Sequence, residues 1–141
     1  IVEKLNKILS NQFVLFTKIW NFHWIVEGKK FKNTHEFFEE LYEEFFKDVD
    51  LTAERIRSLG FNPNGSLKKF IEDSDIEEYT EKETPKSNKM YESILNDFEK
   101  LIKQIREVLD SDLDNGTNKL LEDFIEKYEK NAWMLRSNLD D

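Results

Sequence analysis

The amino-acid sequence predicts an all-α fold: a four-helix bundle with a long crossover, carrying a short extra helix, between its second and third helices. Four segments repeat apolar residues every three to four positions. Two of the connections between them are short and one is long, as in bundles whose chain crosses over once. Aromatic residues make up 13% of the 141 residues, which indicates a packed interior. We expect one domain over residues 1–141.

The first two predicted helices are separated by a short link that contains a glycine. The first helix spans Val2–Glu27, and Gly28 ends it. One of its faces carries Leu5, Leu9, Gln12, Phe13, Phe16, Ile19, Trp20 and His23. The second helix spans Asn33–Leu59, and Phe37 and Phe46 widen its apolar stripe so that it can bury two sides.

Local signals mark both ends of the second helix. Asn33 followed by Glu36 has the spacing of a capping box, and Gly60 stands where a left-handed residue commonly closes a helix. The FNPNGS segment that follows is rich in turn-forming residues. Residues 66–79 are then long enough for one minor helix within a long connection.

The third and fourth helices complete the predicted bundle. Thr84 and Pro85 form an N-cap and a first-turn proline for a third helix that continues to Leu109. The DLDNGT segment breaks this helix, and a fourth helix spans Thr117–Asn138. The short links between the first and second helices and between the third and fourth helices therefore predict two helical hairpins, which the long crossover joins.

The charge balance disfavours several classes of function. Thirty acidic and 21 basic residues give a net charge of −9, and the excess is spread along the chain. Such a surface repels duplex DNA and attracts cations. The chain has no cysteine. We see no leader and no run of about 18 apolar residues, so we expect a cytoplasmic protein without a membrane span.

The chain has only two histidines, His23 and His35. A single histidine on an amphipathic helix is more often a surface or hydrogen-bonded core residue than a ligand. These two residues, however, lie on either side of the Gly28 turn between two helices that should run antiparallel. Both imidazoles should therefore lie near the same end of the bundle, which favours a shared role.

An acidic pair lies further along the second helix. Asp50 and Glu54 are four residues apart, so their carboxylates share a face, which is also typical of a solvated surface. Fifteen residues, about 22 Å of helix, separate His35 from Asp50, so one metal ion cannot touch both within one chain. An antiparallel two-fold partner, crossing near Tyr42 or Glu43, would bring His35 of one copy to the acidic pair of the other. The surface that such an interface would bury is the aromatic face with Phe37, Phe45 and Phe46.

A longer pattern contains these residues. The segment NFHWIVEGKKFKNTHEFFE, residues 21–39, followed by Asp50, the Ala53–Ile56 run and Leu59-Gly60, resembles the signature of the Dps family of miniferritins. The similarity extends over nearly the whole chain. It implies a ferritin-like four-helix subunit in a dodecameric hollow shell, with a ferroxidase centre at each two-fold interface.

The resemblance also implies roles for the matching residues. His23 and His35 would come from one subunit, and Asp50 and Glu54 from its partner. Glu54 would be the ligand that bridges two irons. Glu39, four residues after the second histidine, would be a supporting or occasional ligand.

Two further assignments follow from the same resemblance. Trp24 follows His23 as in the family, where the indole lies beside the iron centre, although packing at the interface explains it equally well. Iron uptake would use three-fold pores near the start of the fourth helix. The candidates for these pores are Asp114, Glu122 and Glu126. Asn115 and Lys119 stand where acidic residues are usual in relatives, which weakens this assignment.

The implied function is iron storage and detoxification. Fe(II) would be oxidised, preferably by hydrogen peroxide, and ferric mineral would be stored inside the shell as protection against oxidative stress. Imidazole and carboxylate ligands suit Fe(II), and carboxylates favour the harder Fe(III) product.

Three alternatives remain open at this stage: a DNA-protecting structural protein of the nucleoid, a purely structural helical oligomer, and a di-iron oxidase with its site inside the subunit. The net charge of −9 argues against the first. Neither end is rich in Lys or Arg, and the chain closes with Asp140 and Asp141, so we expect no direct DNA binding. The sequence has no Glu-x-x-His pair, which argues against the third.

Overall fold

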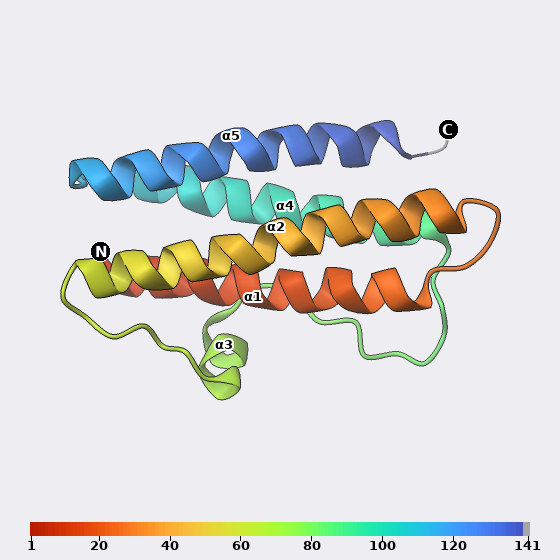
Figure 1. The fold of residues 1–141 in the computed structure, drawn as a ribbon, viewed down its shortest axis with the longest axis horizontal. Coiled ribbons are helices and arrows are strands. Elements are labelled where there is room, and N and C mark those ends of the chain that lie inside the picture. Colours follow the sequence, from red (N-terminus) through yellow and green to blue (C-terminus); the bar gives the residue numbers. More distant parts are fainter. Residues whose placement is uncertain (140–141) are drawn as a thin grey trace.

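Five helices account for most of the computed structural model, which describes residues 1–139 (Figure 1). Four of them are long and form the bundle, and α3 is the short helix of the crossover. Their bounds are α1 Val2–Ile25, α2 Phe31–Ser58, α3 Leu67–Asp73, α4 Ser87–Leu109 and α5 Asn115–Ser137. The predicted all-α bundle with an extra helix in its long crossover is confirmed.

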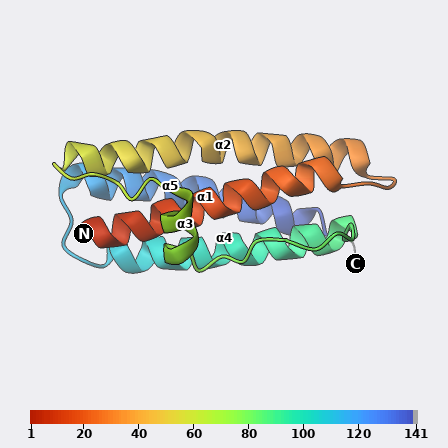
Figure 2. The same cartoon turned by 90° about the horizontal axis from the view of Figure 1, so that it is seen from below.

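The helices pack as two hairpins that face each other. In Figures 1 and 2, α1 lies beside α2, α4 lies beside α5, and α3 lies on the outer side of α1. The connection from α2 to α4 runs the length of the bundle and carries α3 on its way. Within the described residues, no helix is both long and apolar enough to cross a membrane. The prediction of no direct DNA binding cited Asp140 and Asp141, and these two residues lie outside the described residues.

The predicted start of α2 is wrong. The helix begins at Phe31, with Lys30 as its N-cap and without a capping hydrogen bond from a side chain, so Asn33 lies within the first turn and forms no capping box. The reason is the tight turn before it. Gly28 has a φ of +104°, and its carbonyl accepts a hydrogen bond from the Phe31 N–H at 3.1 Å, which leads the chain directly into the helix.

The end of α2 follows the prediction. Gly60 has a φ of +96°, the left-handed conformation that closes many helices. Its N–H donates to the Arg57 carbonyl at 2.9 Å, and the Phe61 N–H donates to the Ile56 carbonyl at 3.2 Å. This pair of bonds is the Schellman motif, and it satisfies two carbonyls that the helix leaves without partners.

Two other helix starts also differ from the prediction. α4 begins at Ser87, and Lys86 is its N-cap, so Thr84 and Pro85 lie before the helix. α5 begins at Asn115, because the Asp114 carboxylate accepts a hydrogen bond from the Thr117 N–H at 3.0 Å and caps the helix there.

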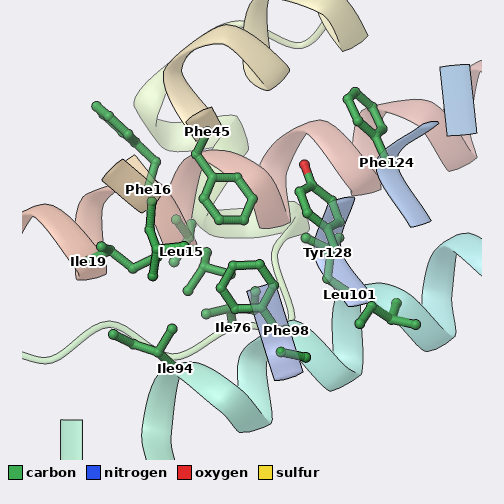
Figure 3. Close-up of a cluster of buried hydrophobic side chains, with 14 of the residues drawn as sticks. Leu15, Phe16, Ile19, Phe45, Ile76, Ile94, Phe98, Leu101, Phe124 and Tyr128 are labelled. Atoms are coloured by element: carbon green, nitrogen blue, oxygen red, sulfur yellow. The ribbon is translucent and has the colours of Figure 1, made fainter. Parts of the chain in front are cut away.

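The hydrophobic core lies between the two hairpins. Figure 3 shows Phe45 of α2, Phe98 of α4 and Tyr128 of α5 converging there, with the Phe45 ring centroid 5.3 Å from that of Phe98 and 5.2 Å from that of Tyr128. Phe45 and Phe98 are completely buried. Burial of each such side chain stabilises the fold by about 1.5–3 kcal/mol.

This position of Phe45 corrects the predicted interface. Phe45 belongs to the core, Phe37 is half-buried with its ring near that of Tyr91, and Phe46 is 67% exposed. Consecutive residues of a helix are about 100° apart around its axis, so Phe45 and Phe46 cannot face the same surface. Only Phe46 of the three is largely available to a partner.

A polar cluster joins three helices inside the bundle. The hydroxyl of Tyr128 donates to the carboxylate of the fully buried Asp48 at 2.7 Å, and the Gln12 amide donates to the same hydroxyl at 3.0 Å. Thr52 donates to the Gln12 side-chain oxygen at 2.8 Å, and Lys127 forms an ion pair with Asp48. Burial raises the pKa of Asp48, and Lys127 opposes that rise.

Two asparagines of α1 anchor the crossover. The Asn6 side-chain oxygen accepts a hydrogen bond from the Asn64 N–H at 2.9 Å. The Asn11 oxygen accepts bonds from the Ser74 hydroxyl and the Asp75 N–H, both at 2.8 Å. These bonds fix the segments before and after α3 against α1.

Candidate metal centre

The two histidines lie side by side at the closed end of the first hairpin. His23 is in the last turn of α1, and His35 is in the second turn of α2, so the short link brings them together. Their ring centroids are 3.7 Å apart, with an angle of 15° between the ring planes. His23 is 6% exposed, and His35 is partly exposed. The prediction that both imidazoles lie at one end is confirmed.

Reciprocal hydrogen bonds orient the two rings. Nδ1 of His23 lies 2.7 Å from the main-chain carbonyl oxygen of His35, and Nδ1 of His35 lies 2.7 Å from that of His23. A carbonyl oxygen can only accept, so each Nδ1 carries the proton. In the neutral ring the lone pair is then on Nε2, which is the form that binds metal ions.

Glu39 completes a group of three potential ligands. It lies one helical turn after His35, and its Oε1 is 3.9 Å from Nε2 of His23. One donor atom from each of the three residues lies within 4.8 Å of the others. Two imidazoles and one carboxylate are a ligand set that suits divalent transition-metal ions, iron included. Among the described residues, no other group of this kind is present.

Aromatic rings enclose the histidine pair. Phe31 stacks on His35 with 4.9 Å between ring centroids, and Tyr42 meets His23 edge-on at 5.1 Å. Burial and the neighbouring carboxylates Glu39 and Glu43 raise the pKa of Tyr42, so its phenol stays protonated near neutral pH. Neither ring belongs to the predicted set of site residues. Their spacing could have indicated them, because residues 31, 35, 39 and 42 follow one side of α2.

The acidic pair is remote from the histidines within the chain. Asp50 and Glu54 are both exposed on α2, and about 22 Å of helix separates Asp50 from His35. Neither joins the three-residue ligand group. A single chain therefore carries two separate sets of potential metal-ligand donors, the histidines with Glu39 and the acidic pair.

An apolar surface extends from Trp24, beside His23, to a groove that Asp50 lines. Its most exposed members are Trp24 at 60%, Phe46 at 67% and Leu51 at 46%. The Trp24 ring packs on that of Trp20, with 4.7 Å between centroids. A groove beside Phe46 is lined by Phe13, Phe16, Phe46, Lys47, Val49, Asp50, Leu51 and Ala53. We refer to Trp20, Trp24, Phe46 and Leu51 together with this groove as the apolar face.

The candidate pore residues have different surroundings. Asp114 caps α5 and accepts a hydrogen bond from the Arg55 guanidinium at 2.5 Å, while Arg55 Nε donates to the Thr117 hydroxyl at 3.0 Å. Gly116 lets this guanidinium approach, because a Cβ there would lie 2.7 Å from it. Glu122 and Glu126 are exposed on α5. The carboxylate of Asp114 thus has a structural role, which the sequence did not indicate.

The capping role of Asp114 predicts a pH effect on stability. Its hydrogen bonds with Thr117 and Arg55 lower its pKa from 3.8 to about 2. A carboxyl group whose pKa is lower in the folded state than in the unfolded state stabilises the fold at pH values above its unfolded-state pKa. This stabilisation is lost as the pH falls through the folded-state pKa. The Asp114→Asn variant keeps a capping oxygen but cannot titrate. Its free energy of unfolding, measured in urea, should therefore lose the pH dependence that Asp114 causes between about pH 4 and pH 2. Asp114→Ala should cost about 1 kcal/mol, and a slope equal to that of the unsubstituted chain would contradict the assignment.

The chain is similar in sequence and fold to known proteins. The family model described as "Ferritin-like domain" matches residues 2–141. The DNA protection during starvation protein 2 of Bacillus anthracis is 39% identical over 143 residues, which cover 99% of this chain and 97% of that protein. The crystal structure of Dps from Staphylococcus aureus superposes with a TM-score of 0.94 at 33% identity, covering 99% of this chain and 95% of that one.

A third similar structure adds a chemical description. Dps from Vibrio cholerae O1, described as a member of a broad superfamily of ferritin-like diiron-carboxylate proteins, superposes with a TM-score of 0.91 at 30% identity. The match covers 96% of this chain and 86% of that one. The fold and the matching family model thus define a ferritin-like protein. Within that class, the chain belongs to the Dps family, as the resemblance of residues 21–39 predicted.

Proposed function

We propose that this chain oxidises Fe(II) at centres shared between two subunits and stores the ferric product inside a dodecameric shell. The observation that carries the proposal is the pair of hydrogen bonds from Nδ1 of His23 and Nδ1 of His35, which leave both Nε2 atoms free beside Glu39. Membership of a superfamily that includes diiron-carboxylate proteins supports iron as the substrate.

The three in-chain ligands form half of the proposed centre. Two neutral imidazoles and one carboxylate hold Fe(II), while the harder Fe(III) product prefers more oxygen ligands. Glu39, with a side chain that is 49% exposed, can supply one. In this proposal the remaining carboxylates come from elsewhere, because Glu39 is the one carboxylate in the group that the described residues form around the two histidines.

The second half of the centre comes from a partner subunit in this proposal. An antiparallel partner that covers the apolar face would carry its own Asp50 and Glu54 to the histidine end of the first subunit, and symmetry would produce two equal centres. The exposed Trp24 adjoins His23, Phe46 lies between His35 and Asp50 on α2, and Leu51 adjoins Asp50. That partner would bury all three side chains. Glu54 is the proposed bridging ligand between two irons, and Trp24 would lie beside the centre.

Hydrogen peroxide is the proposed oxidant. Two Fe(II) ions each give one electron, and peroxide takes both electrons and two protons to form two water molecules. Because both electrons arrive together, hydroxyl radical is not released. Ferric ions would then move to acidic residues on the inner surface of the shell, and Fe(II) would enter near the start of α5, where Asp114, Glu122 and Glu126 remain the candidates.

The names of relatives such as the Bacillus anthracis protein refer to DNA protection. In this chain we propose that protection comes from the removal of Fe(II) and peroxide instead of from contact with DNA. The net charge of −9 supports this choice, because a surface with that excess of carboxylates repels phosphates.

A complementation experiment tests whether the centre is shared. One variant carries His23→Ala with His35→Ala, and the other carries Asp50→Ala with Glu54→Ala. Each should be inactive alone in peroxide-driven Fe(II) oxidation, measured by ferric absorbance. Co-assembly in equal amounts should restore about a quarter of the wild-type rate, because half of the dimers are mixed and each of these has one intact centre.

Two controls accompany this experiment. Glu99→Ala with Glu107→Ala removes two exposed carboxylates from α4 and should leave the rate unchanged. Shells of the two inactive variants, assembled separately and then mixed, should stay inactive. If co-assembled shells of verified mixed composition showed no recovery, the proposal that two subunits share the centre would be wrong.

A further inference from the structure

Two Asn-Gly pairs occur in the chain, Asn64–Gly65 and Asn115–Gly116, and the structure gives them opposite surroundings. Asn64 and Gly65 lie in the crossover segment 61–65, which has no regular secondary structure. Asn115 and Gly116 are the first two residues of α5. This difference matters because an Asn-Gly pair can modify itself when the backbone is free to bend.

The reaction is intramolecular and needs only water. The main-chain nitrogen of the glycine loses its proton and attacks Cγ of the asparagine, and the bond from Cγ to Nδ2 breaks with release of ammonia. Water then opens the five-membered ring. Opening at Cγ gives aspartate, whereas opening at the main-chain carbonyl carbon gives isoaspartate, in which the main chain runs through the former side chain.

We propose that Asn64–Gly65 is a site of spontaneous deamidation that converts part of the crossover to aspartate and isoaspartate. Gly65 is exposed, and no atom lies within 4 Å of the position where its Cβ would be, so the backbone at Gly65 meets no neighbour on that side when it bends. Solvent reaches this position and can open the ring. Asn64 itself is partly buried.

The other pair is protected by the helix. Attack by the Gly116 nitrogen requires the backbone of the first turn of α5 to leave its helical conformation. That turn is fixed by the Asp114 cap, and the guanidinium of Arg55 lies against Gly116, within 2.7 Å of where a Cβ would be. The chain therefore contains its own control for the reaction.

The product would weaken an anchor of the crossover. The Asn64 amide lies 3.5 Å from a carboxylate oxygen of Asp73, and deamidation replaces that amide with a second carboxylate. Like charges at that distance repel. Isoaspartate also adds an atom to the main chain, which displaces the Asn64 N–H from the Asn6 oxygen that now accepts its bond at 2.9 Å. Residues 61–66 would thus loosen from α1.

The test is peptide mapping of the intact assembled protein after incubation at mildly alkaline pH. The peptide with Asn64 should gain the mass difference between an amide and an acid and should separate into two isomers, while the peptide with Asn115 keeps its amide. Gly65→Ala should slow the reaction without changing the fold, since the added Cβ meets nothing. In urea, both pairs should react at similar rates.

Several outcomes would overturn the inference. One is an Asn64 amide that stays intact in the folded protein but reacts in urea, and another is reaction of Asn115 as fast as Asn64 in the folded protein. A second measurement concerns the consequence. Asn64→Asp should lower Tm by about 2 °C, and Asp73→Asn in the same chain should restore it; an unchanged Tm would show that the amide does not anchor the crossover. None of these results depends on iron oxidation.

Discussion

His35→Asn is expected to lower the rate of peroxide-driven Fe(II) oxidation by about 100-fold or more, while the stability of the fold stays unchanged. The side-chain amide of asparagine can take the place of Nδ1 and donate to the His23 carbonyl, a bond of 2.7 Å in the structure. It has no group in the place of Nε2, so the metal ligand is lost. The rate of ferric absorbance increase and the urea midpoint measure the two effects separately.

His35→Gln is the matched variant. Its longer side chain can place an oxygen near the position of Nε2 but offers no donor at the position of Nδ1, so the interhelical hydrogen bond is lost. We expect His35→Gln to be less stable than His35→Asn by about 1 kcal/mol, and to retain more Fe(II) binding. Full activity in His35→Asn would show that His35 has only a structural role.

Much of this site could be predicted from the sequence because it depends on local geometry. The short link around Gly28 brings the end of one helix to the start of the next, so His23 and His35 had to meet. Helical rise alone places Asp50 far from them. The reciprocal bonds could not be predicted, since they depend on the depth at which α1 and α2 pack and on the rotamers of both rings.

The errors in the fold have a different origin. The spacing of a capping box predicts that α2 starts at Asn33, but the turn at Gly28 and the stacking of Phe31 on His35 extend the helix toward its N-terminus. Tertiary contacts overrode a local signal. The aromatic character of Phe45 and Phe46 suggests one shared surface, but neighbouring helix positions face different directions.

Contacts between distant helices were beyond sequence reasoning. Lys18 of α1 donates to the Asp97 carboxylate of α4 at 2.8 Å, and the side chains are only 7% and 6% exposed. The two residues are 79 positions apart, and either would have been placed on a solvated surface from its type alone. The crossover between α2 and α4 fixes which turns of α1 and α4 face each other, and the sequence does not encode that register in a readable pattern.

This buried ion pair gives the largest expected effect on stability. Lys18→Met should lower the free energy of unfolding at neutral pH by about 3–5 kcal/mol, because it leaves the Asp97 carboxylate buried without its partner. Burial already raises the pKa of Asp97, and Lys18 opposes that rise. Without Lys18 the pKa rises further, so the loss of stability should shrink as pH falls through it and the carboxyl becomes neutral.

A double variant separates the attraction between the two charges from the free-energy cost of burying them. Lys18→Met with Asp97→Leu removes both charges and fills the space with apolar atoms, which should recover most of the stability that either single substitution loses. Urea unfolding of the four proteins at neutral pH and near pH 4 gives the coupling free energy directly. If Lys18→Met lost the same stability at both pH values, repacking of the methionine and not the unpaired carboxylate would be the cause. A large coupling at neutral pH that declines in acid would instead show that α1 and α4 are held in register by charge.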